Sequence, residues 1–148
     1  MAADPTLVAD EWDETGAEPT VTILVYSDDA GVRENVRRAV GRRAAKDLPE
    51  IEWLEAATAP AVIAAVDAGR PHLLILDGEA GKTGGMGLCR QIKNEIFEAP
   101  PVLLVTGRAD DAWLASWSEA DAVVSHPLDP IVVGRAVADL VRAVVAAR

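Results

Sequence analysis

Acidic side chains stand at the ends of two of the apolar runs in this sequence. Asp28 and Asp29 follow the run 21–26, and Asp77 ends the run 72–77. Parallel strands bring such residues to one edge of a sheet, where the functional groups of α/β folds gather. Three carboxylates in one crevice repel each other, and a hard cation such as Mg²⁺ neutralises them. The spacing therefore predicts a magnesium site.

The acidic pair also has a purely structural interpretation. A lone acidic pair after a strand is more often a helix cap than a metal ligand, and Asp28 or Asp29 fits as the N-cap of a helix over 30–43. Thr106 and His126 follow two further apolar runs and belong to the same predicted edge. The co-occurrence of polar groups at several strand ends favours the metal interpretation.

The elements that must position these residues alternate between strand-length apolar runs and stretches of helical periodicity. Strands are predicted at 21–26, 51–56, 72–77, 102–106 and 122–125. Helices are predicted at 30–43, 60–68, 86–95, 110–120 and 129–147. Strands that alternate with helices require right-handed crossovers and form a parallel sheet with helices on both faces. The pattern predicts an α/β fold, a doubly wound (βα)₅ three-layer sandwich.

Length, charge and cysteine content exclude several classes of protein. The 148 residues suffice for one domain, and the net charge of −10 argues against binding nucleic acid through bulk positive charge. Cys89 is the only cysteine, which excludes an intrachain disulfide, and its place in the apolar stripe of a helix predicts a core position. The sequence shows no secretion signal and no apolar run long enough to span a membrane. We expect a cytoplasmic protein.

The first nineteen residues differ in composition from the rest of the chain. They contain six acidic residues and no basic one, and they show no periodicity. This predicts a flexible acidic tail over 1–19 and a folded domain over 20–148. A solvated extension is the simplest interpretation. Trp12 leaves a second one open, in which the tail docks on a basic partner with the indole as its apolar anchor.

From about residue 21 to its end the chain resembles the receiver domain of the two-component response regulator family. The strand-end residues and the segment DGEAGKTGGMGLCRQIK carry the likeness. The resemblance implies a flavodoxin-like sheet with strand order 2-1-3-4-5. The resemblance implies that Asp28 and Asp29 hold Mg²⁺ and that Asp77 accepts a phosphoryl group. It implies that Thr106 follows the phosphoryl oxygens. Two further positions match the family: Gly85, which opens the third helix, and Pro127, which follows the fifth strand.

The sequence departs from the family pattern around the same site. His126 replaces the usual lysine, and its imidazole is shorter and carries no permanent charge. Val123 replaces an aromatic switch residue, and Ala80 and Gly81 replace a more rigid turn. Glu79 adds a fourth acid beside Asp77, and we count it among the expected metal ligands. Phosphate sensing is assigned to Thr106 and His126.

Two surface groups are candidates for partner contact. Trp113 and Trp117 stand one turn apart on the predicted helix 110–120. Facing inward they belong to the core, whereas facing outward they form an aromatic patch. Basic residues cluster on and after the first helix: Arg37, Arg38, Arg42, Arg43 and Lys46. This group forms a solvated face or holds the acidic tail of the same or a neighbouring chain.

Two functions are predicted, and neither is enzymatic. Apart from the residues for self-phosphorylation, the sequence shows no pair of nucleophile and base. In the first, a stand-alone atypical response regulator without an output domain is phosphorylated on Asp77, with Mg²⁺, by a histidine kinase. In the second, the chain is a phosphorylation-independent adaptor or an accessory subunit of a larger protein complex. Both signal by protein contact through Trp12, Trp113 and Trp117, and neither involves nucleic acid or membrane insertion.

Overall fold

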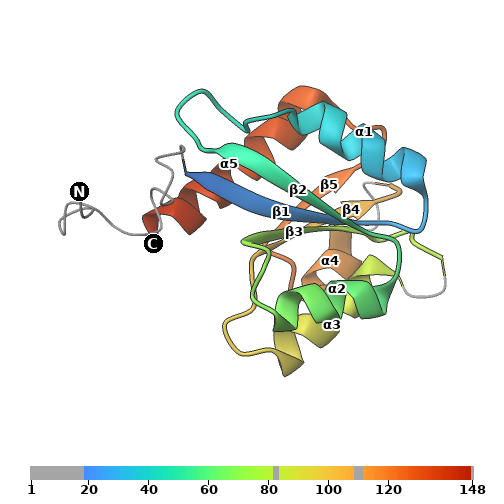
Figure 1. Ribbon diagram of the computed structural model, residues 1–148. Coiled ribbons are helices and arrows are strands. Elements are labelled where there is room, and N and C mark those ends of the chain that lie inside the picture. Colours follow the sequence, from blue (N-terminus) through green and yellow to red (C-terminus); the bar gives the residue numbers. More distant parts are fainter. Residues whose placement is uncertain (1–18, 82–83, 109–111, 148) are drawn as a thin grey trace.

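The computed structural model describes residues 19–81, 84–108 and 112–147, which form a five-stranded parallel sheet between two layers of helices (Figure 1). The strands are β1 (Thr20–Tyr26), β2 (Glu50–Ala56), β3 (Leu73–Asp77), β4 (Val102–Thr106) and β5 (Ala122–Ser125). The helices are α1 (Ala30–Val40), α2 (Ala59–Asp67), α3 (Gly85–Glu95), α4 (Ala112–Ser118) and α5 (Pro130–Ala146). The strand order β2-β1-β3-β4-β5 confirms the predicted fold. The predicted acidic tail, apart from Pro19, lies outside the described residues, and so does Trp12.

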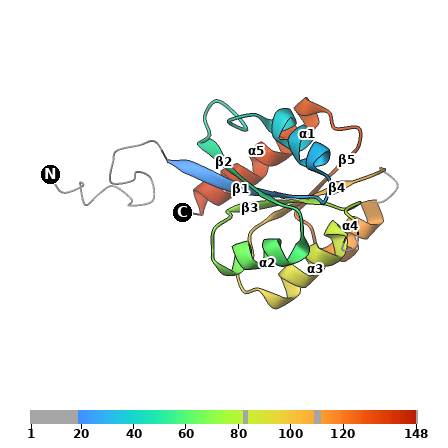
Figure 2. The ribbon, with the colours of Figure 1, turned by 45° about the vertical axis from the view of Figure 1, so that its right-hand side comes forward.

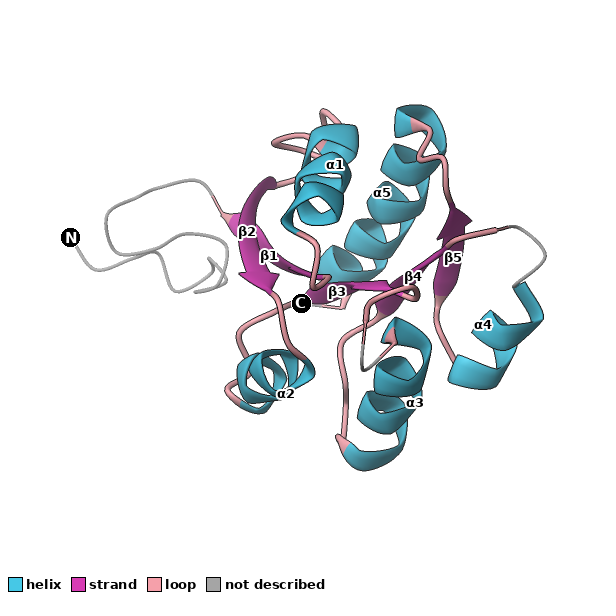
Figure 3. Cartoon of the chain, turned by 90° about the vertical axis from the view of Figure 1, so that its right-hand side faces the viewer, coloured by secondary structure: helices cyan, strands magenta, loops and turns pink. Residues whose placement is uncertain are grey.

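Helices α1 and α5 cover one face of the sheet, and α2, α3 and α4 cover the other (Figures 2 and 3). Alternate strand residues therefore enter two separate cores. Ile23 and Val25 of β1 pack in the core under α1 and α5, whereas Leu24 and Tyr26 pack in the core under α2 and α3. Every residue of β3 and β4 is buried, as expected for central parallel strands covered on both faces.

Helix α1 is shorter than predicted, and this changes the position of two arginines. It ends at Val40 rather than residue 43, because Gly41 has a φ of 84° and its N–H donates to the carbonyl of Arg37 at 2.8 Å. Glycine adopts this left-handed conformation without steric cost, which makes it a common helix stop. Arg42 and Arg43 therefore lie in the loop that leads to β2, not on the helix.

Helix α5 is amphipathic, as predicted from its charge spacing. Val133 and Val137 are buried, whereas Arg135, Asp139 and Arg142 are exposed. Among the described residues, no helix combines the length and the apolar character that a membrane crossing requires.

Candidate functional site

Asp77 lies at the carboxyl edge of the sheet, at the end of β3, and is only 5% exposed. Its Oδ2 accepts a hydrogen bond from the Ser27 hydroxyl at 2.8 Å, and its Oδ1 accepts one from the backbone N–H of Glu79 at 2.8 Å. Burying a carboxylate is costly unless donors satisfy it. The two donors therefore hold both oxygens of Asp77 in a defined orientation.

Ser27 follows β1 directly and is fully buried. While its hydroxyl donates to Asp77, its oxygen accepts from the backbone N–H of Asp29 at 3.0 Å. The sequence prediction did not include this residue, because the two acids that follow it are the stronger signal for a metal site. The available signal was its position: Ser27 is the first residue after a strand that ends beside β3, so its side chain reaches the same edge as Asp77.

The predicted acidic pair is divided between two tasks. Asp28 is exposed, and its Oδ2 accepts from the N–H of Gly81 at 3.0 Å, which ties the β1–α1 loop to the β3–α3 loop. A Cβ atom at Gly81 would overlap that same oxygen, so the glycine is required for this approach. Asp29 instead caps α1, since its Oδ1 accepts from Gly31 N–H at 2.7 Å. The structure thus places Asp29 in the structural role that the sequence left open.

Glu79 is exposed and reaches across the edge to the next loop. Its Oε1 accepts from the N–H of Gly107 at 3.2 Å. A Cβ atom at Gly107 would lie 2.7 Å from Oε1, so the close approach depends on the glycine. The side chain expected to join the cation ligands thus links the loops that follow β3 and β4.

The two predicted phosphate-sensing residues, Thr106 and His126, are linked by a backbone hydrogen bond. Thr106 is fully buried, and its hydroxyl is 3.1 Å from the carbonyl oxygen of Arg108 and 3.0 Å from Ser125 Oγ. The N–H of His126 donates to the carbonyl of Thr106 at 2.9 Å, and the peptide bond to Pro127 is cis. In this conformation the Thr106 hydroxyl is engaged with β5 and the β4–α4 loop. His126 is half-buried and lines a groove beside Asn35 and Arg38 of α1.

Electrostatics at the edge are dominated by carboxylates. Burial, and then the negative charges of Asp28 and Asp77, raise the pKa of the Tyr26 phenol above its ordinary value. The negative charges of Asp28 and Asp77 therefore both act on Tyr26, at the end of β1.

The expected set of four metal-binding carboxylates is not assembled. Across the described residues, no three His, Cys, Asp or Glu side chains gather as a metal site requires. Mg²⁺, however, is commonly held by one or two carboxylates together with water and a substrate phosphate. Asp28 and Asp77, two hard oxygen donors on neighbouring strand ends, fit that smaller donor set. Asp29 and Glu79 each use one carboxylate oxygen in a loop contact, Asp29 as the cap of α1 and Glu79 with the N–H of Gly107.

The tryptophans of α4 face outward. Trp113 is 69% exposed and Trp117 is 49% exposed. The guanidinium of Arg90, on α3, lies 4.8 Å from the Trp117 ring centre, and its Nη1 donates to the Trp117 carbonyl at 2.6 Å. The outward interpretation of this pair is therefore confirmed for both side chains. Cys89 is fully buried, which confirms its core position.

No protein-family model matches this sequence. Curated relatives do match it: a protein described as an uncharacterized response regulatory protein, from two strains of Mycobacterium tuberculosis, is 56% identical over 121 residues, covering 82% of this chain and 91% of the relative. The chain belongs to the response regulator family. Its described fold is that of a receiver domain.

Solved structures support the receiver fold at lower sequence identity. The signal receiver domain of a putative LuxO repressor protein from Vibrio parahaemolyticus has a TM-score of 0.69 at 19% identity, with 84% of this chain and 92% of that chain covered. A CheY-like receiver domain protein from Methanospirillum hungatei has a TM-score of 0.66 at 19% identity, covering 87% and 99%. A BeF3-activated DrrB receiver domain has a TM-score of 0.63 at 21% identity, covering 83% and 98%.

Proposed function

We propose that this receiver accepts a phosphoryl group on Asp77 and passes the change to a protein partner. The observation that carries the proposal is the state of Asp77: a carboxylate at the carboxyl edge of the sheet, almost buried, with both oxygens oriented by donors from two neighbouring loops. A carboxylate used only to cap a helix or to pair at the surface needs no such arrangement. A phosphoryl acceptor does, because the attacking oxygen has to be aimed at phosphorus.

The reaction is a transfer from a phosphorylated histidine kinase or a small acyl phosphate. An Asp77 oxygen forms the new bond to phosphorus, while the bond from phosphorus to the donor's nitrogen or oxygen breaks and the electron pair leaves with the donor. Asp28 and Asp77 would hold Mg²⁺, and the ion would supply neutralisation of the negative charge on the transferring group. The backbone N–H of Glu79 and the hydroxyl of Ser27 keep Asp77 in place throughout.

The product changes the local charge and hydrogen bonding. An aspartyl phosphate adds phosphoryl oxygens that need donors. Thr106 is the nearest hydroxyl on the next strand, since Asp77 pairs with Val105 in the β3–β4 register. To donate to the phosphoryl group, its hydroxyl must stop donating to the Arg108 carbonyl, while it can still accept from Ser125. Thr106 thereby links the acceptor to β5 and the adjoining His126.

Phosphorylation is tested by incubating the full chain with Mg²⁺ and acetyl phosphate and recording the intact mass. We expect the wild-type protein to gain the mass of one phosphoryl group. Asp77→Asn should gain none, whereas Asp139→Asn, which removes an exposed acid on α5, should behave as wild type. Absence of any mass gain in the wild-type protein would refute the proposal, and so would an equal gain in Asp77→Asn.

A second function, a phosphorylation-independent adaptor, is favoured by a different observation. Trp113 and Trp117 are large, exposed aromatic side chains, and such residues dominate the energetics of protein interfaces. In addition, His126 and Val123 stand where the family has lysine and an aromatic switch. For this function, a pull-down without any phosphodonor captures a partner with Asp77→Asn as well as with wild type, and Trp113→Ala/Trp117→Ala loses it. A partner captured only after phosphorylation contradicts this function.

A further inference from the structure

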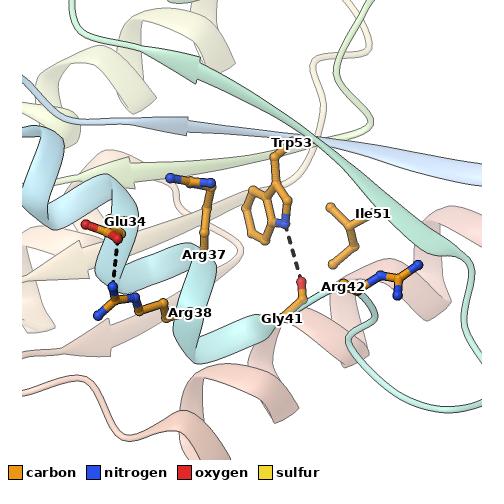
Figure 4. A pocket seen from close by; sticks show the side chains of 7 residues that line it. All are labelled: Glu34, Arg37, Arg38, Gly41, Arg42, Ile51 and Trp53. Atoms are coloured by element: carbon orange, nitrogen blue, oxygen red, sulfur yellow. Dashed lines mark hydrogen bonds and ion pairs between the residues drawn. The ribbon is translucent and has the colours of Figure 1, made fainter.

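A pocket between the end of α1 and β2 is separate from the acceptor site (Figure 4). It has a volume of about 380 Å³ and is lined by Glu34, Arg37, Arg38, Gly41, Arg42, Ile51 and Trp53. Its apolar part is formed by Ile51 and by the Trp53 indole, whose Nε1 donates to the Gly41 carbonyl at 3.3 Å. Arginines rim this apolar part. An apolar floor with a cationic rim suits a ligand that combines carboxylates with an apolar side chain.

The arginines of the pocket are held by weak pairs. Arg38 pairs with Glu34 at 2.8 Å and Arg42 with Glu50 at 2.8 Å, but these arginine side chains are 75% and 85% exposed. Exposed pairs of this kind contribute little to stability, so another carboxylate can replace either partner at small cost. The Nε atom of Arg37 is buried and has no hydrogen-bond acceptor among the described residues, and its carboxylate neighbour, Glu55, lies 3.7 Å away.

The charge around the pocket is opposite to that of the chain as a whole. Residues 30–46 contain six basic residues and one acidic residue. Residues 1–19 contain six acidic residues and no basic one, in a chain whose net charge is −10. The most acidic and the most basic segments of this protein are thus separated by a single strand.

That strand begins beside the pocket. Thr20, the first residue of β1, pairs with Glu50, and Val21 pairs with Ile51, which lines the pocket. Glu50 is also the partner of Arg42. A chain that enters the sheet here starts beside the arginine rim. Trp12 lies eight residues before Thr20, and at about 3.3 Å per residue it can reach roughly 26 Å from the start of the strand.

We propose that the acidic N-terminal segment, residues 10–18, docks on the α1–β2 pocket of its own chain. Its carboxylates pair with Arg38 and Arg42, and Trp12 packs against the apolar part formed by Ile51 and Trp53. A short tether gives the segment an effective concentration in the millimolar range, which favours docking within one chain over docking between chains. An acidic partner that uses this pocket has to displace the segment first. The proposal does not depend on phosphorylation of Asp77.

The test places a nitroxide label on the tail of the full chain through Ala9→Cys and follows the ¹⁵N spectrum. Burial raises the pKa of the Cys89 thiol to about 11, so Cys89 stays protonated and the label attaches at residue 9. We expect the label to cause loss of signal at the Trp53 indole N–H and at Gly41. Gly69, which precedes β3 on the other face of the sheet, should keep its signal.

The matched variants separate docking from mere proximity. Arg38→Gln/Arg42→Gln should restore the Trp53 and Gly41 signals. High salt should do the same, because the Debye length falls to about 3 Å at 1 M ionic strength. Arg70→Gln/Arg135→Gln removes two exposed arginines that do not line this pocket and should leave the signal loss unchanged. Equal signal loss at Gly69 and Gly41, or loss that survives Arg38→Gln/Arg42→Gln, overturns the proposal.

A second copy of the chain is the competing occupant. Mixing spin-labelled protein at natural isotope abundance with unlabelled ¹⁵N protein reports only contacts between chains. Signal loss at Trp53 in this mixture, as strong as in the singly labelled chain, assigns the pocket to the neighbour's tail and overturns docking within one chain. No loss in the mixture, together with loss in the labelled chain, supports the proposal.

Discussion

The acidic edge around Asp77 and the arginine pocket between α1 and β2 hold charged groups in opposite ways. Asp77 is 5% exposed and accepts from a buried hydroxyl and a backbone N–H. Arg38 and Arg42 extend into solvent, each beside one carboxylate. Fixed donors orient a buried charge for chemistry, whereas exposed charges can exchange partners. The first arrangement suits a reaction site, and the second suits an electrostatic docking site.

The largest effect should come from the backbone that supports the edge. At Gly85, an added Cβ would lie 2.5 Å from the carbonyl oxygen of Asp77 and 3.1 Å from the amide nitrogen of Gly78. Backbone cannot give way as a flexible side chain can, so Gly85→Ala should lower the free energy of unfolding by about 3 kcal/mol. Urea denaturation measures this change in the free energy of unfolding. Gly87→Ala is the control, because a Cβ there meets open space and alanine favours helix. An equal loss in the two variants contradicts the packing argument.

The next effect concerns the hydroxyl that holds Asp77. Ser27→Ala removes a donor to Asp77 and an acceptor for the N–H of Asp29, which leaves a buried carboxylate oxygen of Asp77 without its hydroxyl donor. We expect a loss of about 2 kcal/mol in the free energy of unfolding. Ser116→Ala, at an exposed position of α4, should change it by about 0.5 kcal/mol or less. A loss for Ser27→Ala as small as that control would show that the hydroxyl does not support the carboxylate.

Removing an exposed ion pair should change the free energy of unfolding very little in urea denaturation. Arg38→Gln removes the pair with Glu34, four residues earlier on the same helix. Such pairs contribute about 0.5 kcal/mol or less, and salt should reduce that contribution further. If Arg38→Gln lowered the free energy of unfolding as much as Ser27→Ala in the same buffer, the contrast between exposed and buried charges would be wrong.

The effect that is smallest at neutral pH is a pH dependence that comes from the buried Cys89 thiol. Burial raises the pKa of Cys89 to about 11 from an ordinary 9, opposed by a hydrogen bond from Ser118. The unfolded chain therefore releases the thiol proton first, and stability that is fully present below pH 9 falls as the pH rises towards 11. Cys89→Ala should show a shallower fall than wild type in chemical denaturation at pH 8, 9 and 10. Tyr26, whose pKa is raised as well, acts in the same direction and accounts for a residual slope.

Much of the fold followed from the sequence by local patterns. The run LLILD is apolar on both faces, which restricts it to the centre of a parallel sheet and puts Asp77 at the carboxyl edge. The resemblance to the receiver family put Gly85 at the start of α3, and the structure confirms it there. The end of α1 was predicted too late, since the helical pattern continues to Arg43 while the backbone turns at Gly41.

The division of labour at the edge was decided in three dimensions. Asp28 and Asp29 are adjacent acids with the same chemistry, yet one ties two loops together and the other caps α1. Ser27, the neutral neighbour, makes the contact with Asp77. Likewise, helical spacing put Trp113 and Trp117 on one face, and only packing determined that this face is exposed.

The sequence by itself determined the order of strands and helices, the position of Asp77 at a strand end and the opposite charges of residues 1–19 and 30–46. These depend on residue type and on periods of two or 3.6 residues, which are local properties. The tertiary structure decided which side chains meet. That outcome depends on the register between β1 and β3, and on loop geometry that brings residues 27 and 77 within a hydrogen bond of each other.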